Sequence, residues 1–365
     1  MIFALMKKIA VVFFILLSTL SLGQNGVPFF LSLGAKRGFM IAHRPFMEHL
    51  IQENTWGYEL SFSRQMNDGD YYSTRSNYPL NGFTFEIRNF GYDKVLGFAY
   101  SIFKYQNFTL IQTQTNWCLD FKVGTGLTFI TKKYDKINNP KNNAIGSHLN
   151  AKVAFKLELN KFFKTTHFGI GTELTHFSNG AMQMPNLGLN GVSAYLNFGY
   201  NFNQRDFNSE KTKALKRQFD NSYSWILEGI ISMSEVYPIP LDAKKYPIFA
   251  GRFLFTKPLN RSWNYEIAFD GVYNVSNLHK YFDSSYTAID VPQLGIYAGL
   301  SFNYYRSQFV FGMGYYVLDI INPLGRIYNR VGYRYFFKHN WFGLFNIRAN
   351  FGKADFFELG LGYKF

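Results

Sequence analysis

A histidine and a serine stand two positions apart in the segment THFSNGAMQMPNLGLN, residues 175–190, and an asparagine closes it. A serine hydroxyl becomes an effective nucleophile when a neighbouring base takes its proton, and histidine is the usual base. A third polar group then holds the imidazole in its useful tautomer. His176, Ser178 and Asn190 are therefore residue types for nucleophilic attack on an ester. Asn190 would take the orienting role that asparagine has in Cys-His-Asn sites.

The three residues stand at the ends of rows in which apolar and polar side chains alternate. Successive side chains on a strand point to opposite faces, so a period of two separates two environments. In segments 164–178 and 189–203, His176 and Ser178 continue one apolar row and Asn190 heads the other. We therefore expect an antiparallel hairpin that gathers the three side chains on one face, where directly paired residues lie roughly 5 Å apart.

The first 24 residues predict export. Lys7 and Lys8 precede an apolar run, and small and polar residues follow it. This order is typical of a secretory signal peptide, which we place at residues 1–24. The apolar run is too short to cross ~30 Å of hydrocarbon as a helix. No cysteine follows it, so we do not expect a lipoprotein anchor.

The composition favours a barrel in a membrane. Aromatic residues make up 20% of the chain, yet apolar residues are diluted at every second position. No later segment has ~18 consecutive apolar residues, which argues against a helical membrane protein. The single cysteine, Cys118, excludes an intramolecular disulfide and a cysteine-based metal site. Together with export, this pattern predicts a transmembrane β-barrel in the outer membrane of a Gram-negative bacterium. The net charge of +14 suits anionic headgroups but is a weak partner signal.

The alternation predicts an all-β, antiparallel fold of about sixteen strands, among them 55–65, and Phe365 closes the last one as in bacterial outer-membrane proteins. A soluble sandwich is the alternative to the membrane barrel. We favour one large barrel; an eight-stranded barrel with a second β domain, such as a second eight-stranded barrel, is the other arrangement. Residues 25–203 would carry the site, and residues 222–365 would add further strands. The charged segment 204–221 reads as a periplasmic linker, because an even number of strands precedes it.

HFSNG, then PN, then a residue fourteen positions beyond the histidine, resembles the lipid A 3-O-deacylase family of outer-membrane barrels, also called acyloxyacyl hydrolases. The resemblance covers about residues 27–203. It implies that His176 is the base and Ser178 the nucleophile, both facing lipid. The family usually has glutamate where this chain has Asn190, and an asparagine there resembles outer-membrane phospholipase A instead. Residues 204–365 form an extension that the resemblance does not explain.

An ester hydrolase also needs hydrogen-bond donors for the developing oxyanion. By resemblance, Asn179, Asn186 and backbone N–H groups around Gly180 are candidates, although ordinary turn chemistry would also select these residue types. Glu173 falls on the opposite row and is a poor triad member. The remaining histidines show no metal-ligand spacing, and they are His43, His49, His148, His167, His279 and His339.

We therefore expect an outer-membrane serine esterase that removes an ester-linked acyl chain from lipid A. Its partners would be lipopolysaccharide, outer-membrane lipids and the outer-membrane assembly machinery, and not nucleic acid. No cofactor or metal is expected; calcium enters only under the phospholipase A alternative. The other alternative is a non-enzymatic pore or surface-binding barrel, in which the polar residues of the hairpin merely mark where the bilayer ends.

Overall fold

The structure is a computed structural model, and its described residues are 28–66, 72, 78–205, 221–236, 244–279, 285–321, 323–338, 340–351 and 353–365. The expected signal peptide, residues 1–24, lies outside these ranges. Most of the charged segment 204–221 also lies outside them. Both assignments therefore stay sequence-based predictions.

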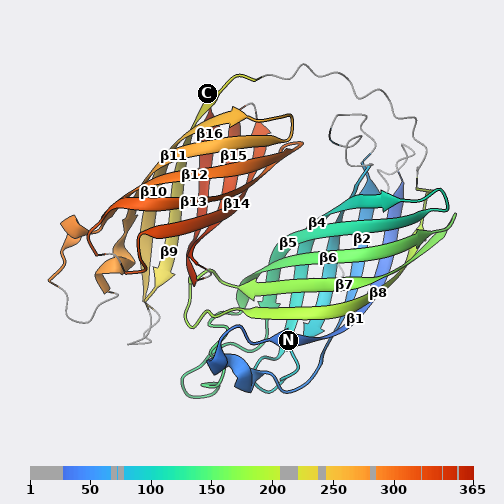
Figure 1. Ribbon diagram of the computed structural model, residues 1–365. Coiled ribbons are helices and arrows are strands. Elements are labelled where there is room, and N and C mark those ends of the chain that lie inside the picture. The colour runs from blue at the N-terminus through green and yellow to red at the C-terminus, as the bar shows by residue number, and fades with distance from the viewer. Residues whose placement is uncertain are drawn as a thin grey trace.

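The first eight strands form one closed antiparallel barrel in chain order, drawn from blue to green in Figure 1. Closure occurs where the first strand pairs with the eighth, from Phe30↔Asn201 to Ile41↔Asn190. A 3-10 helix, η2 (Pro45–Leu50), follows the first strand. The strands are β1 (Phe29–Ile41), β2 (Thr55–Gln65), β3 (Leu80–Asn89), β4 (Phe98–Gln112), β5 (Trp117–Ile130), β6 (Leu149–Phe162), β7 (Thr166–Ser178) and β8 (Leu189–Asn201).

The last eight strands form a second closed barrel, drawn from yellow to red, in which β9 pairs with both β10 and β16. Two short 3-10 helices, η3 (Val275–His279) and η4 (Ala288–Asp290), lie between β11 and β12. The strands are β9 (Ser224–Glu235), β10 (Lys245–Pro258), β11 (Trp263–Asn274), β12 (Pro292–Tyr304), β13 (Ser307–Asp319), β14 (Ile327–Lys338), β15 (Trp341–Asn350) and β16 (Lys353–Lys364). Among the described residues, no helix is long and apolar enough to span a membrane.

The all-β class and the sixteen strands are confirmed, whereas the preferred single barrel is wrong. Because β1 supplies the partner of β8, β8 has no open edge to which β9 could add. The two-barrel arrangement that we kept as the alternative is the one observed.

The two-residue alternation explains which side chains face outward. In β8, Tyr195 and Asn197 are buried, whereas Leu196 and Phe198 are exposed. Large apolar side chains outside and polar ones inside reverse the pattern of a soluble domain. This is the distribution that suits a strand between lipid and a polar lumen.

The lumen of the first barrel is filled by buried charges. The Lys36 ammonium lies 2.8 Å from Glu59, 2.5 Å from Glu86 and 2.6 Å from Glu173, measured between nitrogen and carboxylate oxygen. The three carboxylates lie close enough together to hold a cation, and the ammonium group of Lys36 is the cation that lies between them. An eight-stranded barrel has an interior just wide enough for its side chains. The packed network therefore argues against a pore through this barrel.

The lumen of the second barrel is filled by a different set of charges. Arg330 donates to Glu358 at 2.8 and 2.9 Å and to Asp270 at 2.9 Å. Arg348 donates to Glu358 at 3.0 Å, and its guanidinium lies 4.5 Å from the Tyr328 ring centroid. Arginines, one of them in a bidentate pair with Glu358, thus neutralise the buried carboxylates here, as Lys36 does in the first barrel.

The two barrels touch at the end that holds the β10–β11 and β12–β13 turns. Gln106 of β4 donates to the Tyr304 hydroxyl at 2.8 Å, and Phe108 packs edge-on against the same ring. Tyr72 donates to the Arg261 carbonyl at 3.4 Å. A second contact joins the end of β9 to the β7–β8 loop.

Candidate active site

The β7–β8 hairpin brings His176 and Asn190 directly opposite each other as a cross-strand pair. The His176 Nδ1 and Asn190 Oδ1 atoms lie 2.6 Å apart, within hydrogen-bond distance. Both side chains lie on the outward row of the barrel. The register of the hairpin, set by eleven further paired positions between Phe177↔Leu189 and Thr166↔Tyr200, fixes this meeting.

Ser178 is the last residue of β7 and shares the outward row with His176. Residues two apart on a strand are separated by roughly 7 Å between Cα atoms, so both side chains can reach one substrate atom. Ser178 is only 6% exposed, unlike most of its row. In the part of the chain that the structure describes, its hydroxyl makes no hydrogen bond to His176. Nucleophile–base contacts are often long until a substrate is bound.

His43 completes a chain of polar contacts that the sequence did not reveal. The Asn190 Nδ2 atom lies 2.9 Å from His43 Nδ1, just beyond the end of β1. An amide NH2 group only donates, so His43 Nδ1 accepts and the amide oxygen is turned toward His176. His176 Nδ1 then carries the hydrogen, which leaves Nε2 as the basic nitrogen. The only sequence signal for His43 is its place after β1, which pairs with β8.

Gly188 forms the floor beneath the His176 ring. It adopts a φ of 77°, and a Cβ built on it would lie 2.7 Å from His176 Cε1 and 3.4 Å from Nε2. Its backbone N–H donates to the Ala144 carbonyl at 3.1 Å, which ties the floor to the β5–β6 loop. Any side chain here would displace the imidazole, so glycine is required both by conformation and by space.

Asn179 organises the loop of residues 179–188. Its backbone N–H donates to Asn186 Oδ1 at 2.9 Å. Its side-chain amide donates to Ser147 Oγ and to the Gln183 carbonyl, each at 2.8 Å. Among the described residues nothing accepts a hydrogen bond from Asn186 Nδ2. The Asn186 side chain is thus held by its oxygen, and its two N–H donors stay available.

The chain turns sharply directly after Asn179. Gly180 and Ala181 have φ angles of 60° and 64°, both in the left-handed region. For Ala181 this conformation costs roughly 1–2 kcal/mol, which neighbouring contacts must offset. The two residues place successive backbone N–H groups beside the end of β7, where Ser178 lies.

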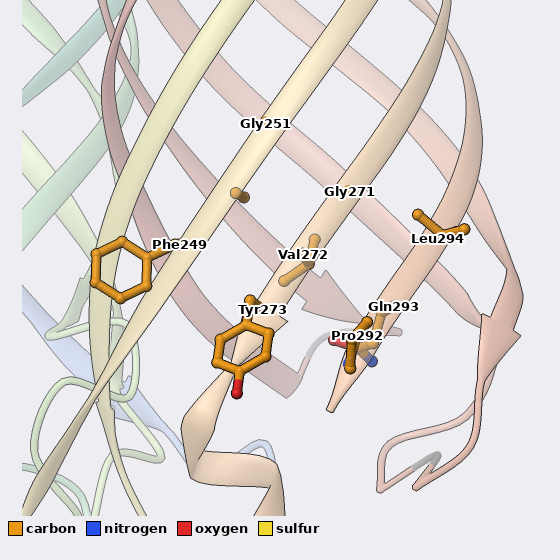
Figure 2. Close-up of a pocket in the computed structure, with 9 residues that line it drawn as sticks. Phe249, Gly251, Gly271, Val272, Tyr273, Pro292, Gln293 and Leu294 are labelled. Atoms are coloured by element: carbon orange, nitrogen blue, oxygen red, sulfur yellow. The ribbon is translucent and has the colours of Figure 1, made fainter. Parts of the chain in front are cut away.

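Glu173 lies in the lumen, as its row predicts, where Arg88 donates to it at 2.7 Å. It therefore cannot reach the outward pair of His176 and Ser178. A shallow apolar cavity occurs elsewhere, on the outward face of the second barrel between β10, β11 and β12. Figure 2 shows Phe249, Tyr273 and Leu294 around it. None of the candidate site residues lines it, so it is separate from the hairpin site.

The first eight strands form a closed barrel with large apolar side chains on its outer surface, and His176, Ser178 and Asn190 lie together at one rim of that surface. Residues 44–201 match the family model described as lipid A 3-O-deacylase (PagL). Residues 221–365 match the model described as acyloxyacyl hydrolase, C-terminal domain. The chain belongs to the lipid A 3-O-deacylase family, and the second match assigns to that family the half that the sequence resemblance left unexplained.

The solved structures that match this chain include an outer-membrane enzyme and two porins. The outer-membrane enzyme PagL is 14% identical, covering 46% of this chain and 97% of that one, with a TM-score of 0.32. KdgM porin is 6% identical, covering 73% of this chain and 95% of that one, with a TM-score of 0.20. A triple mutant of the Rhodopseudomonas blastica porin is 7% identical, covering 93% and 99%, with a TM-score of 0.17. The search of curated proteins gave no match.

Family membership confirms several expectations from the sequence. The protein is an ester hydrolase of the outer membrane of Gram-negative bacteria, and lipid A is its substrate class.

Proposed function

We propose that this protein removes an ester-linked acyl chain from lipid A with a Ser178–His176–Asn190 triad on the lipid-facing surface of its first barrel. The observation that carries the proposal is the cross-strand hydrogen bond between His176 and Asn190, with Ser178 next on the same outward row. A carboxylate in the position of Asn190 would have to be desolvated at the lipid interface, so a neutral partner is physically reasonable.

The reaction follows from the orientation of the imidazole. His176 Nε2 takes the hydroxyl proton as Ser178 Oγ bonds to the ester carbonyl carbon. The tetrahedral intermediate collapses, the bond to the sugar oxygen breaks, and His176 returns the proton to that oxygen. Water then gives a proton to the same nitrogen and attacks the acyl carbon, the bond to Ser178 Oγ breaks, His176 returns the proton to Oγ, and the fatty acid leaves. Asn190 keeps the basic nitrogen facing Ser178 through both steps.

The loop supplies donors for the oxyanion. Asn186 Nδ2 and the Gly180 backbone N–H are the groups we assign to this task, because both belong to the turn that Asn179 fixes beside Ser178. Removing one such donor from an acyl-transfer site costs roughly 100- to 1000-fold in turnover.

His43 acts as a positioning residue for Asn190. An amide can rotate by half a turn and offer its NH2 group to His176, which would stabilise the wrong tautomer. The acceptor at His43 Nδ1 opposes this rotation, since only one orientation satisfies both rings.

The surroundings suit an amphipathic substrate. Below the site, Leu174 and Ile170 continue the outward row and are about half exposed, so an acyl chain can lie along them. With the N-terminus of β1 in the periplasm, β7 runs outward and its end lies at the outer leaflet, where lipopolysaccharide resides.

The test compares lipid A from cells that carry the parent protein with lipid A from cells that carry Ser178→Ala or His176→Ala. We expect both variants to lose deacylation, measured as the shift in lipid A mass, while heat-modifiable migration shows a folded barrel. Phospholipid is assayed beside lipid A, with and without calcium. Full activity of either variant on lipid A would refute the proposal, and calcium-dependent cleavage of phospholipid would favour the phospholipase A alternative.

A further inference from the structure

We infer that the second barrel is a positioning element of the active site: its β9 and β16 strands hold the loop that carries the oxyanion donors, and Glu235 is the central positioning residue. This inference rests on the proposed function. It assigns a task to residues 221–365, which contribute no triad member.

The first contact is polar and joins β9 to the loop at three points. A Glu235 carboxylate oxygen accepts a hydrogen bond from the Met184 backbone N–H at 2.8 Å. The Glu235 backbone N–H donates to the Ala181 carbonyl at 3.3 Å, and the Ser234 hydroxyl donates to the same carbonyl at 3.4 Å. The end of β9 therefore holds the turn at two places, Ala181 and Met184.

The second contact is steric and joins β16 to the loop. Phe357 belongs to the outward row of β16, and its row neighbours Leu359 and Leu361 are 49% and 58% exposed. Phe357 is only 6% exposed, and a Cβ on Gly180 would lie 2.3 Å from its ring. The ring thus packs on the bare backbone of Gly180, whose N–H is one proposed oxyanion donor.

These contacts add to the anchors that the loop has within the first barrel. Asn179 fixes the loop from within, through Gln183 and Asn186, and Gly188 ties its far end to Ala144. Gly180 and Ala181 hold left-handed conformations that isolated chains disfavour. The second barrel contacts these two residues and Met184. Oxyanion donors act only when they are held within about 0.5 Å of their productive place, and loops seldom achieve this alone.

The first experiment uses Glu235→Leu and Glu235→Gln in the full-length protein, with purified lipid A as substrate. Glu235→Leu cannot accept from Met184, so we expect kcat to fall about 10- to 100-fold while KM stays within about twofold. Glu235→Gln retains an oxygen acceptor and should recover most of the turnover. Backbone hydrogen exchange at Met184 should accelerate in Glu235→Leu and not in Glu235→Gln.

The second experiment tests the steric contact by a double-mutant cycle. Gly180→Ala should lower kcat, because the new methyl group meets the Phe357 ring and the left-handed conformation becomes strained. Adding Phe357→Ala should recover part of that loss, since it opens space for the methyl group. Leu359→Ala, two positions along the same row, is the matched control and should act like the parent.

The outcomes separate this inference from the proposed function. Loss of activity in Ser178→Ala, together with parental kcat and parental Met184 exchange in Glu235→Leu, would overturn the role of the second barrel and leave the triad intact. Activity retained in Ser178→Ala would instead overturn the triad. Equal losses in Glu235→Leu and Glu235→Gln, with no recovery in the Gly180→Ala and Phe357→Ala pair, would also contradict a positioning role.

Discussion

The two barrels share strand number and order, yet their last hairpins differ. In the first barrel residues 179–188 separate β7 from β8, whereas in the second only residues 351 and 352 separate β15 from β16. The outward row of β7 ends in His176 and Ser178; that of β15 ends in Ile347 and Ala349. The closed sheet is thus a scaffold common to both barrels. Ester hydrolysis also needs polar residues at the end of an outward row and a loop long enough to supply hydrogen-bond donors for the oxyanion.

Both lumens bury charged side chains, and the two barrels neutralise these charges with different residues. In the first barrel the glutamates pair mainly with lysines, and also with Arg88. In the second barrel arginines pair with Asp270, Glu266, Glu228 and Glu358. Buried charges are tolerated only when they are paired and hydrogen-bonded. Because neither lumen network includes a proposed triad member, stability and catalysis are spatially separated in this molecule.

The largest loss of deacylation is expected when the β7–β8 loop of the first barrel is shortened to the length of the β15–β16 turn. Replacing residues 179–188 by a two-residue Asn-Gly turn should lower deacylation at least about 1000-fold, because it removes all assigned oxyanion donors. The barrel should still fold, since two-residue turns suit antiparallel hairpins. Lipid A mass and heat-modifiable migration measure the two results. Shortening the turn at 259–262 in the second barrel is the control, and deacylation that survives the loop replacement would show that the donors lie elsewhere.

A smaller effect is expected at the third triad member. Asn190→Ala should lower turnover by roughly 10- to 1000-fold, less than loss of Ser178, because the imidazole loses its orientation but remains a base. Asn190→Glu should retain substantial activity, since glutamate also accepts from His176 Nδ1. Initial rates on lipid A measure both variants. If Asn190→Ala matches the parent, Asn190 is not part of the triad.

A still smaller effect is expected at His43. His43→Ala should lower turnover about 3- to 10-fold, the rate equivalent of a hydrogen bond contributing ~1 kcal/mol. His49→Ala is the matched control, because the His49 imidazole lies 2.8 Å from the Lys141 carbonyl and makes no hydrogen bond to Asn190 among the described residues. Equal rates for the two variants would remove His43 from the site.

The smallest effect on activity is expected from the second lumen. Arg330→Met removes one arginine partner from Asp270 and one from Glu358, so the free energy of unfolding should fall by about 3–5 kcal/mol. Turnover at a temperature where the protein stays folded should be unchanged. Denaturant unfolding and lipid A assays test both statements. A parallel loss of turnover would show that the lumen of the second barrel is coupled to the site.

The sequence predicts individual strands well because each strand has one face toward lipid and one toward the lumen. Its apolar and polar residues therefore alternate. The segment 55–65 coincides with β2, and segments 164–178 and 189–203 contain β7 and β8. Alternation cannot say which edge β8 joins, since β1 and β9 offer the same backbone groups, and so the sequence does not decide between one large barrel and two smaller ones.

The sequence predicts the part of the site that lies within one hairpin and not the part that comes from distant strands. His176, Ser178 and Asn190 lie within one hairpin, so their row positions and register bring them together. His43 and Glu235 reach the site through β1 and β9, over sequence separations of 147 and 51 residues to their partners. No local pattern marks either residue, because each acts through a contact between distant segments.

Closure of the first barrel has a consequence for biogenesis. The seam runs between β1 and β8, and it ends at Ile41↔Asn190, two residues before His43. The polar chain from His176 through Asn190 to His43 therefore crosses the seam. A chain whose first and eighth strands are still apart has the β7–β8 hairpin but lacks the contact between Asn190 and His43, so the complete polar chain forms only when the barrel closes.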